Sequence, residues 1–429
     1  MGHGSPGMNG DWYPKRRLIE LETRIAFDDE TIRFRFEWDQ PDPGGWIHDM
    51  LVYRNGRWEQ FADPSPWVAD GHDEEHTGFY EDRVSFLLDD GAVRGFEEFG
   101  GWLTVHGGMR SLPDAVDEQT VADHPHFGEA GLGRTDIRKY IPQACAGEWW
   151  ENDWREIRPP EELAALKANG VFLDLPMWRA HRSDPLGYGT DHHVLDYRHG
   201  DAGQNTYTDQ AWDPVDGPTY MWDTGVVPDG ALDLAAVRSG DIPDQATDTY
   251  ALALADAVPF DPDVAAWEGA MIPRRPLQPP YGSAADWTAS GTWVDGRWTV
   301  EMERRLRTEH PADTTQLVPG GEYTWTPAVH HGAGQRWHWV AYPYKLGLGV
   351  RPEYVGDDAT DATTELVATE FTGAEPDWDG IEPYTIPLIF PGVVSWDDLA
   401  YGHPRAEAVR NCEVTMWELY EKDPASFLP

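Results

Sequence analysis

Lysine is scarce in this 429-residue chain, which contains five lysines against 28 arginines and 76 acidic residues. The formal net charge is therefore −43. Because nucleic-acid binding needs a basic face, this composition argues against nucleic acid as a partner. Few lysines together with many carboxylates are typical of a halophilic protein, since concentrated salt screens the repulsion among like charges.

Cysteines and long apolar runs are also rare or absent. The two cysteines, Cys145 and Cys412, form no CxxC or CxxCH motif and cannot build a disulfide framework. We interpret them as two ordinary thiols, with a bond between them as the alternative. No run of about 18 apolar residues occurs, so we expect no transmembrane segment. The pair Arg16-Arg17 is not followed by an apolar segment, so no signal peptide is predicted.

Apolar and aromatic residues are abundant, with 40% hydrophobic residues and 22 tryptophans, so the chain has ample material for a folded core. Residues 21–38 alternate between apolar and polar side chains, which predicts a half-buried strand. Asn55-Gly56 and Asp295-Gly296 predict the turns of two hairpins, at 50–61 and 291–306. Further strands are expected at 83–89, 101–106, 171–178, 322–329 and 337–344.

Helix signals are few. A proline at the start and a glycine after the end predict a helix over 160–170, and another is expected within 405–422. Many short strands with turn signals favour a mainly β fold. We therefore predict an antiparallel β-sandwich, immunoglobulin-like or DOMON-like, with loop and short-helix insertions.

Composition suggests three parts along the chain. Residues 1–20 are expected to form an N-terminal extension and residues 21–350 a single sandwich domain. The stretch of about 198–288 is rich in Gly, Pro, Asp and Thr and has little sustained period, so we interpret it as an ordered insertion rather than a second core. Residues 351–429 are expected to form an acidic C-terminal loop and extension, with 351–381 at the surface.

One of the five lysines, Lys345, lies in the almost uncharged segment WHWVAYPYKLGLGV (337–350). Burial among aromatic and aliphatic neighbours disfavours a protonated amine, and a neutral amine is a metal ligand. The alternative is that Lys345 packs its stem and keeps its ammonium group in water.

Two other segments carry candidate binding residues. In FGGWLTVHGGMRSLPD (99–114), His106 and Met109 flank a Gly-Gly pair that lets the backbone approach a flat ligand, although a methionine in a loop is often structural. In FLDLPMWRAHRSDPLGYGTDHHVLDYR (172–198), Trp178 offers an aromatic wall and Arg179, His181 and Arg182 offer cations suited to carboxylates. Adjacent His192 and His193 face opposite sides of a strand, so a metal ion shared by both is not expected.

The order of these segments resembles the ethylbenzene dehydrogenase haem-subunit family. The segments are YEDRVSFLLDDG (80–91), GGWLTVHGGMR (100–110), FLDLPMWRAHRSDPLGYGTD (172–191), the hairpin DGRWTVEMERRL (295–306) and the strand at Lys345. The likeness covers about residues 21–350, interrupted at 198–288. Members of this family are the γ subunits of complex iron–sulfur molybdoenzymes, which include ethylbenzene and dimethyl sulfide dehydrogenases and nitrate, chlorate and selenate reductases.

The resemblance implies one non-covalent haem b between the sheets, with Met109 and Lys345 as axial iron ligands. Relatives with covalent haem carry CxxCH where this chain has LTVHGG, so covalent attachment is excluded here. His106 is retained at the position of the haem-ligating histidine in that branch, which leaves a His/Met or His/Lys pair as the alternative. Trp178, Arg182 and Trp339 are expected to contact the cofactor.

A haem with two protein ligands has no open position and relays electrons. The expected function is therefore electron transfer between the iron–sulfur (β) subunit of a molybdopterin (α) enzyme, of the haloarchaeal nitrate-reductase type or a related one, and an external carrier. The chain is not expected to be a catalyst by itself. We expect it at the extracytoplasmic face of the membrane, co-exported with a partner subunit, or otherwise in the cytoplasm. The alternative function is a haem-free carbohydrate-binding β-sandwich, which the many Trp and Tyr residues would suit.

Overall fold

Alternating side chains form two strands where the sequence predicts a single strand over 21–38. β1 (Leu18–Phe27) and β2 (Thr31–Asp39) form an antiparallel pair. The apolar residues Ile32, Phe34 and Phe36 of β2 are fully buried. On the outer face of β2, Arg33 forms an ion pair with Glu303 at 2.8 Å. The period of two therefore separates a core face from a charged face.

The structure is a computed structural model that describes residues 18–41, 50–60, 81–110, 115–147, 153–209, 211–239, 241–242, 251–330, 338–352 and 365–389. The helix predicted within 405–422 and Cys412 lie outside these residues. Cys145 is a buried free thiol, and burial raises its pKa to about 12.

Both predicted hairpins are confirmed. Asn55 and Gly56 have φ of 53° and 78°, and they join β3 (Met50–Arg54) to β4 (Arg57–Gln60). Asp295 and Gly296 have φ of 50° and 85°, and they join β18 (Thr288–Val294) to β19 (Arg297–Arg305). Positive φ at both central residues is the geometry that Asn-Gly and Asp-Gly favour in two-residue turns.

One large sheet of 14 strands dominates the molecule, with the order β18-β19-β2-β1-β23-β22-β20-β5-β6-β8-β9 along its main path. Its further strands are β5 (Arg83–Asp89), β6 (Leu173–Asp174), β7 (Met177–Arg179), β8 (His192–Val194), β9 (Arg198–Gly200), β20 (Glu322–His330), β21 (His338–Val340), β22 (Tyr344–Leu348), β23 (Glu365–Glu370) and β24 (Tyr384–Ile389). The mainly β prediction is confirmed. The sheet is mixed, however, because β23 pairs in parallel with both β1 and β22.

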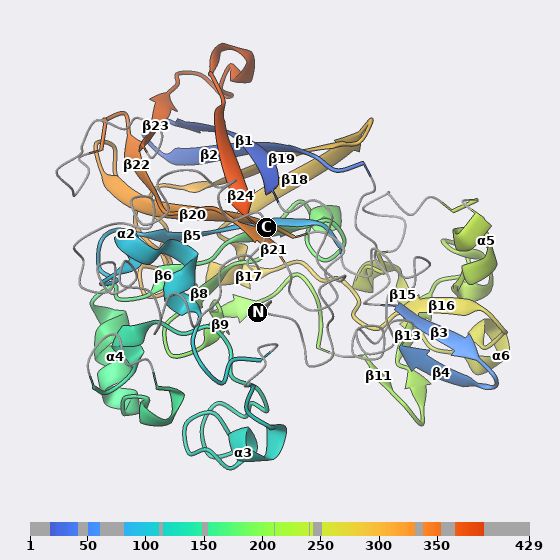
Figure 1. Ribbon diagram of the computed structural model, residues 1–429. Helices are drawn as coiled ribbons and strands as arrows, with labels where there is room; N and C mark the ends of the chain where they lie inside the picture. Colours follow the sequence, from blue (N-terminus) through green and yellow to red (C-terminus); the bar gives the residue numbers. More distant parts are fainter. Residues whose placement is uncertain are drawn as a thin grey trace.

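The large sheet curves over itself, so that strands distant in the strand order face each other. Phe34 of β2 lies 4.9 Å from Phe86 of β5 and 6.0 Å from Trp325 of β20, measured between ring centroids. Figure 1 shows β1, β2, β18 and β19 in a layer above β5 and β20. The main core fills the space between these two layers, as expected of a sandwich-like fold.

The interpretation of residues 198–288 as an insertion without a core of its own is wrong. A second hydrophobic cluster joins Met50, Leu51 and Val52 of β3 to residues between Met221 and Ile272. Its sheet has the order β14-β16-β3-β4, with β14 (Leu232–Asp233) and β16 (Ala270–Pro273), and it lies to the right in Figure 1. Since part of this core comes from the early hairpin, neither stretch shows a complete apolar pattern in the sequence.

Residues 351–381 are also not simply a surface loop. Residues Glu365–Glu370 form β23, in which Leu366 and Ala368 are 1% exposed, and Tyr384–Ile389 form β24, which pairs with β1. The main sheet therefore extends beyond residue 350. β23 and β24 are short, are flanked by acidic residues and pair with strands far away in the sequence, so the local pattern does not predict them.

Two other strand predictions need correction. Residues Gly100–Thr104 form the 3-10 helix η4, with both Trp102 and Leu103 buried, so side chains do not alternate there. The strand expected at 337–344 is interrupted at residues 341–343, because Pro343 lacks the backbone donor that a central strand needs. The helix at 160–170 is confirmed as α4 (Pro160–Ala168).

The remaining elements are short. The strands are β10 (Gly203–Gln204), β11 (Trp212–Asp213), β12 (Gly217–Pro218), β13 (Tyr220–Trp222), β15 (Ala257–Pro259) and β17 (Tyr281–Gly282). The helices are α2 (Phe96–Phe99), α3 (Glu118–Ala122), α5 (Leu234–Ser239), α6 (Pro262–Ala265), η5 (Pro142–Ala144), η6 (Trp154–Glu156), η7 (Asp184–Leu186), η8 (Pro228–Gly230), η9 (Leu254–Asp256), η10 (Ser283–Ala285) and η11 (Trp378–Gly380). Among the residues described, no helix is long and apolar enough to cross a membrane.

Candidate functional site

Lys345 lies in a row of polar side chains across the main sheet. In the strand register, Asp89 of β5 pairs with Thr324 of β20, Thr324 pairs with Lys345 of β22, and Lys345 pairs with Glu365 of β23. Directly paired residues point to the same face of a sheet. The neighbours of Lys345 on its own strand, Tyr344 and Leu346, are buried on the opposite face. The lysine therefore faces a side of the sheet that is rich in carboxylates.

The Lys345 amine forms an ion pair that neither sequence-based alternative included. Its Nζ lies 2.6 Å from Oε2 of Glu97 in α2, and its side chain is 13% exposed. Burial raises the pKa of the neighbouring Asp89 to about 7, although the N–H groups of Gly91 and Val93 donate to its carboxylate. To bind a metal, Nζ must leave Glu97 and lose its proton.

Helix η4 packs against the chain that leads to Lys345. Gly100 has φ of 54°, and a Cβ at this position would lie 2.8 Å from Thr326 Oγ1 and 3.0 Å from Pro343. The ring of Trp102 stacks on Tyr342 with centroids 5.6 Å apart. The structure therefore brings the segment GGWLTVHGGMR and the segment around Lys345 together, through the close approach that only glycine allows.

His106 is fully buried, and both ring nitrogens face backbone oxygens. Nδ1 lies 2.9 Å from the carbonyl oxygen of Gly107 and Nε2 lies 2.8 Å from that of Arg138. The ring also stacks on Tyr140, with centroids 3.6 Å apart. In this conformation neither nitrogen is directed at a cofactor, and the imidazole ties the loop to residue 138.

Met109 is half-buried in the loop that follows η4. The residue before it, Gly108, has φ of 77°, and a Cβ there would lie 2.8 Å from Trp154 and Val116. The residue after it, Arg110, donates its N–H to the carbonyl of Ile137 at 2.9 Å. Both sides of the methionine are thus fixed, and its thioether remains a candidate ligand.

β5, β7 and the turn after β7 supply a buried group of arginines around Glu81. Arg182 Nε lies 2.6 Å from the Glu81 carboxylate, Arg83 Nε 3.2 Å and Arg179 Nη1 3.7 Å. The backbone N–H groups of His181 and Arg182 also donate to Glu81. Burial would raise the pKa of Glu81, but these three guanidinium groups lower it to about 2. Three buried guanidinium groups therefore share one carboxylate.

Tyr207 extends this arginine group. The guanidinium carbons of Arg179, Arg182 and Arg275 lie 5.7, 5.7 and 5.8 Å from the centre of its ring. Burial would raise the pKa of Tyr207, yet the surrounding arginines lower it below its usual value. Although the chain has a net charge of −43, this local environment is positive and suits a bound anion.

Trp178 does not line the arginine group. It is fully buried, it donates its Nε1 hydrogen to Asp184 at 2.7 Å, and its ring lies 4.9 Å from that of Trp298. Trp178 and Arg179 point to opposite faces of β7 because successive strand residues alternate. Trp339, on β21, is 5% exposed and pairs with Val329. The expected roles of both tryptophans in binding a cofactor stay predictions.

The Lys345 row and the arginine group lie at opposite ends of β5. Asp89, the last residue of β5, belongs to the row, whereas Arg83, the first, belongs to the arginine group. At roughly 3.3 Å per residue, the strand separates these two positions by about 20 Å. The structure therefore does not bring Arg182 next to Lys345, and a shared cofactor contact by these two residues stays a prediction.

The described aromatic residues do not form a sugar-binding platform. Trp38, Trp178, Trp287, Trp298 and Trp325 are fully buried, and Trp339, Tyr342 and Tyr344 also lie in the core. Of the aromatic residues in the described ranges, Tyr281 alone is exposed, at 62%. A carbohydrate platform needs exposed rings, so burial argues against the carbohydrate-binding alternative.

Several residues of these sites were not predicted from the sequence. Glu97 and Glu81 are two of 76 acidic residues, and no local pattern distinguishes them. A third group contains His193, Asp201 and Asp313, whose ligand atoms lie within 4.8 Å of one another. Strand alternation separates His193 from its neighbour His192, whereas the partners of His193 come from other parts of the chain.

Glu81→Gln should destabilise the protein strongly. A glutamine amide leaves the three guanidinium groups without their carboxylate, and breaking a buried ion pair costs about 3–5 kcal/mol. Because the folded state lowers the pKa of Glu81 from 4.5 to about 2, its contribution should be present above pH 4.5 and lost as the pH falls toward 2. Denaturant unfolding in molar KCl, with the exposed Glu161→Gln as the control, measures this. A loss of less than about 0.5 kcal/mol would contradict it.

Comparison with known proteins gives one family match. Residues 11–341, more than half of the chain, match the family model described as ethylbenzene dehydrogenase. The matched range contains η4, the arginine group and Trp339, and it ends just before Lys345. A search of curated proteins found no match.

Proposed function

The chain belongs to the ethylbenzene dehydrogenase family, and on that premise we propose that it is a haem b-binding electron-transfer subunit. The single observation that carries the proposal is the family match over residues 11–341. This family forms subunits of molybdoenzyme complexes.

Met109 and Lys345 would hold the haem iron. A thioether and an amine together are a donor set that suits a low-spin haem, and the thioether favours the reduced iron. The two backbone carbonyls that engage the ring nitrogens of His106 support Met109 and Lys345 over the His106 alternative. Bound in this way, the haem supplies one-electron transfer.

The remaining residues position these two ligands. Glu97 holds the Lys345 amine in place and must release it for ligation. Trp102 and Tyr342 stack between η4 and the strand of Lys345, which keeps water from that side of the site. Gly108 shapes the loop that presents Met109. Since two protein ligands leave no open coordination position, the chain would relay electrons and not transform a substrate itself.

The proposed partners follow from the family. An iron–sulfur subunit and a molybdopterin subunit would form the complex, of the nitrate-reductase type or a related one, and an external carrier would exchange electrons with the haem. The proposed location is the extracytoplasmic face of the membrane, reached by co-export with a partner subunit, with the cytoplasm as the alternative. The proposed salt-adapted setting rests on the net charge of −43.

Purified full-length protein should be red and contain one haem b per chain. The haem should move completely into acidified organic solvent, because no CxxCH motif binds it covalently. Pyridine haemochrome spectra before and after extraction measure both quantities. Haem that stays with the polypeptide, or a folded protein from haem-sufficient cells that contains none, would refute the proposal.

A further inference from the structure

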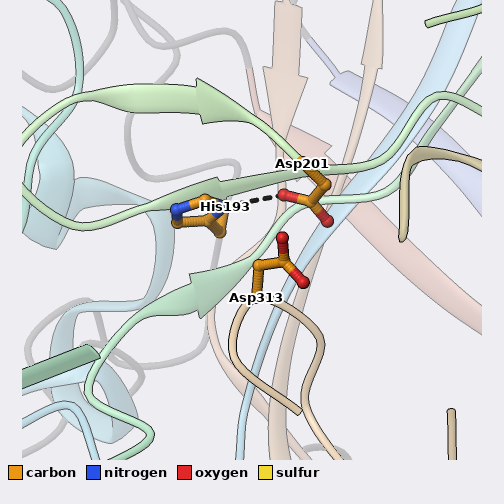
Figure 2. Close-up of side chains that lie close together, drawn as sticks. All are labelled: His193, Asp201 and Asp313. Carbon is orange, nitrogen blue, oxygen red and sulfur yellow. Dashed lines mark hydrogen bonds and ion pairs between the residues drawn. The ribbon is translucent and has the colours of Figure 1, made fainter. Parts of the chain in front are cut away.

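Three buried side chains from distant parts of the chain lie close together, and none of them is proposed to bind the haem. His193 belongs to β8, Asp201 directly follows β9, and Asp313 lies in the loop between β19 and β20. His193 Nδ1 lies 2.7 Å from Asp201 Oδ1, and the two side chains are 5% and 0% exposed. Figure 2 shows the carboxylates of Asp201 and Asp313 directed toward each other beside the imidazole. These three residues are called the His-Asp-Asp group below.

One oxygen of the group has no donor. Within the described part of the chain, nothing donates a hydrogen bond to Asp201 Oδ2, although this side chain is fully buried. Asp313, in contrast, is held in place: its Oδ2 accepts hydrogen bonds from the N–H of Ala202 at 3.1 Å and the hydroxyl of Ser283 at 2.9 Å. The unpartnered oxygen of Asp201 points toward this fixed carboxylate (Figure 2).

Two further acidic residues adjoin the His-Asp-Asp group: Asp174 pairs with His193 in the strand register, and the backbone of Asp191 bonds to that of Asp201. Asp174 and Asp191 are fully buried, and each has one carboxylate oxygen without a donor among the described residues. The buried guanidinium of Arg304 lies 3.7 Å from Asp174. Clustered buried carboxylates repel one another and are stable only when they are paired, protonated or bound to a metal. The orphaned oxygen of Asp201, next to a histidine and a second carboxylate, favours a metal.

We propose that His193, Asp201 and Asp313 bind one divalent transition-metal ion, Zn²⁺ or Mn²⁺. Imidazole nitrogen together with carboxylate oxygen is a ligand set that these ions accept. Ca²⁺ prefers six to eight oxygen ligands, and Mg²⁺ retains several waters. The nitrogen ligand therefore selects a transition metal over both.

Binding requires only local adjustment. Ligand atoms in a tetrahedral shell with bonds of about 2.1 Å lie roughly 3.4 Å apart, whereas these atoms lie within 4.8 Å of one another. The ion replaces the hydrogen bond between His193 and Asp201, uses the orphaned Asp201 oxygen and draws Asp313 inward. The histidine then carries its hydrogen on Nε2 and directs the Nδ1 lone pair at the ion.

The site would fasten an edge of the main sheet. β8 and β9 are the last two strands on the path of the sheet, and Asp313 belongs to a loop more than 100 residues later in the chain. Ser283, which holds Asp313, begins η10. An ion here cross-links these three regions, so its role is structural and independent of the haem.

Metal content and thermal stability test this proposal. Full-length protein in molar KCl is stripped with EDTA, re-supplied with Zn²⁺, Mn²⁺, Mg²⁺ or Ca²⁺, and dialysed. Elemental analysis, which counts haem iron separately, should find about one equivalent of Zn²⁺ or Mn²⁺ per chain. The same two ions should raise the Tm by several degrees, because they bind the folded state alone. Mg²⁺ and Ca²⁺ at equal concentration should do neither.

Asp201→Asn should abolish both metal retention and the Tm response, while the exposed Asp209→Asn keeps them. If Asp201→Asn does not fold, the comparison of EDTA-stripped and metal-loaded wild type still decides. Wild type that retains no metal and shows no Tm response overturns the proposal. Retention by Asp201→Asn, or a response to Ca²⁺ alone, overturns the ligand set.

Discussion

Lys345→Gln should yield a folded protein that loses most of its haem. Glutamine keeps a polar group near Glu97, but it lacks the basic amine that would bind iron. Replacing only the outer partners of metal ligands already costs on the order of 10–100-fold in affinity, and losing a ligand should cost at least as much. Haem per chain after gel filtration, together with the spin state of any haem retained, measures the effect.

Two controls separate ligation from the ion pair. Glu97→Gln removes the carboxylate but leaves the amine, so it should retain low-spin haem. Lys167→Gln removes a lysine on α4 and should change nothing. If Glu97→Gln and Lys345→Gln lose haem equally, Lys345 acts through its ion pair. If neither loses haem, Lys345 is not a ligand.

Transfer from molar KCl into dilute buffer should unfold the protein or release its cofactor. The screening length grows from about 3 Å at 1 M salt to about 10 Å at 0.1 M. The carboxylates that give the net charge of −43 then repel one another across the whole molecule. Circular dichroism melting curves at increasing KCl should show a Tm that rises steeply with salt.

Sucrose at equal osmolality is the control for this effect, because it favours compact states without screening charge. A Tm that is the same in dilute buffer and in molar KCl would contradict the account of the composition. An equal rise in sucrose and in KCl would assign the stabilisation to solvent exclusion and not to charge screening.

Sequence patterns predicted the turns and strands that depend only on neighbouring residues. The turns at Asn55-Gly56 and Asp295-Gly296 follow from residues that tolerate positive φ. β23 could not be found in this way, because its six residues lie among acidic segments and pair in parallel with two distant strands. The second core was missed for the same reason, since β3 contributes to it from far away in the sequence.

The candidate site shows the same limit. The uncharged segment around Lys345 correctly predicts a buried strand, because Tyr344 and Leu346 are buried. Its partner Glu97 comes from a helix far earlier in the chain, so no sequence window contains both. Likewise, alternation along β8 correctly separates His192 from His193, but it says nothing of Asp313. The sequence therefore indicates which residues could bind a ligand, but only the fold shows which of them lie close together.

Magnetic circular dichroism of the haem-loaded wild type tests whether Met109 and Lys345 bind the haem iron. We expect one low-spin haem b per chain with a near-infrared thioether-to-iron charge-transfer band. Met109→Leu should abolish that band while preserving volume and apolarity. His106→Gln should leave the low-spin spectrum intact, because the ring nitrogens of His106 serve backbone carbonyls. Conversion to high spin by His106→Gln, with no change in Met109→Leu, would contradict the account.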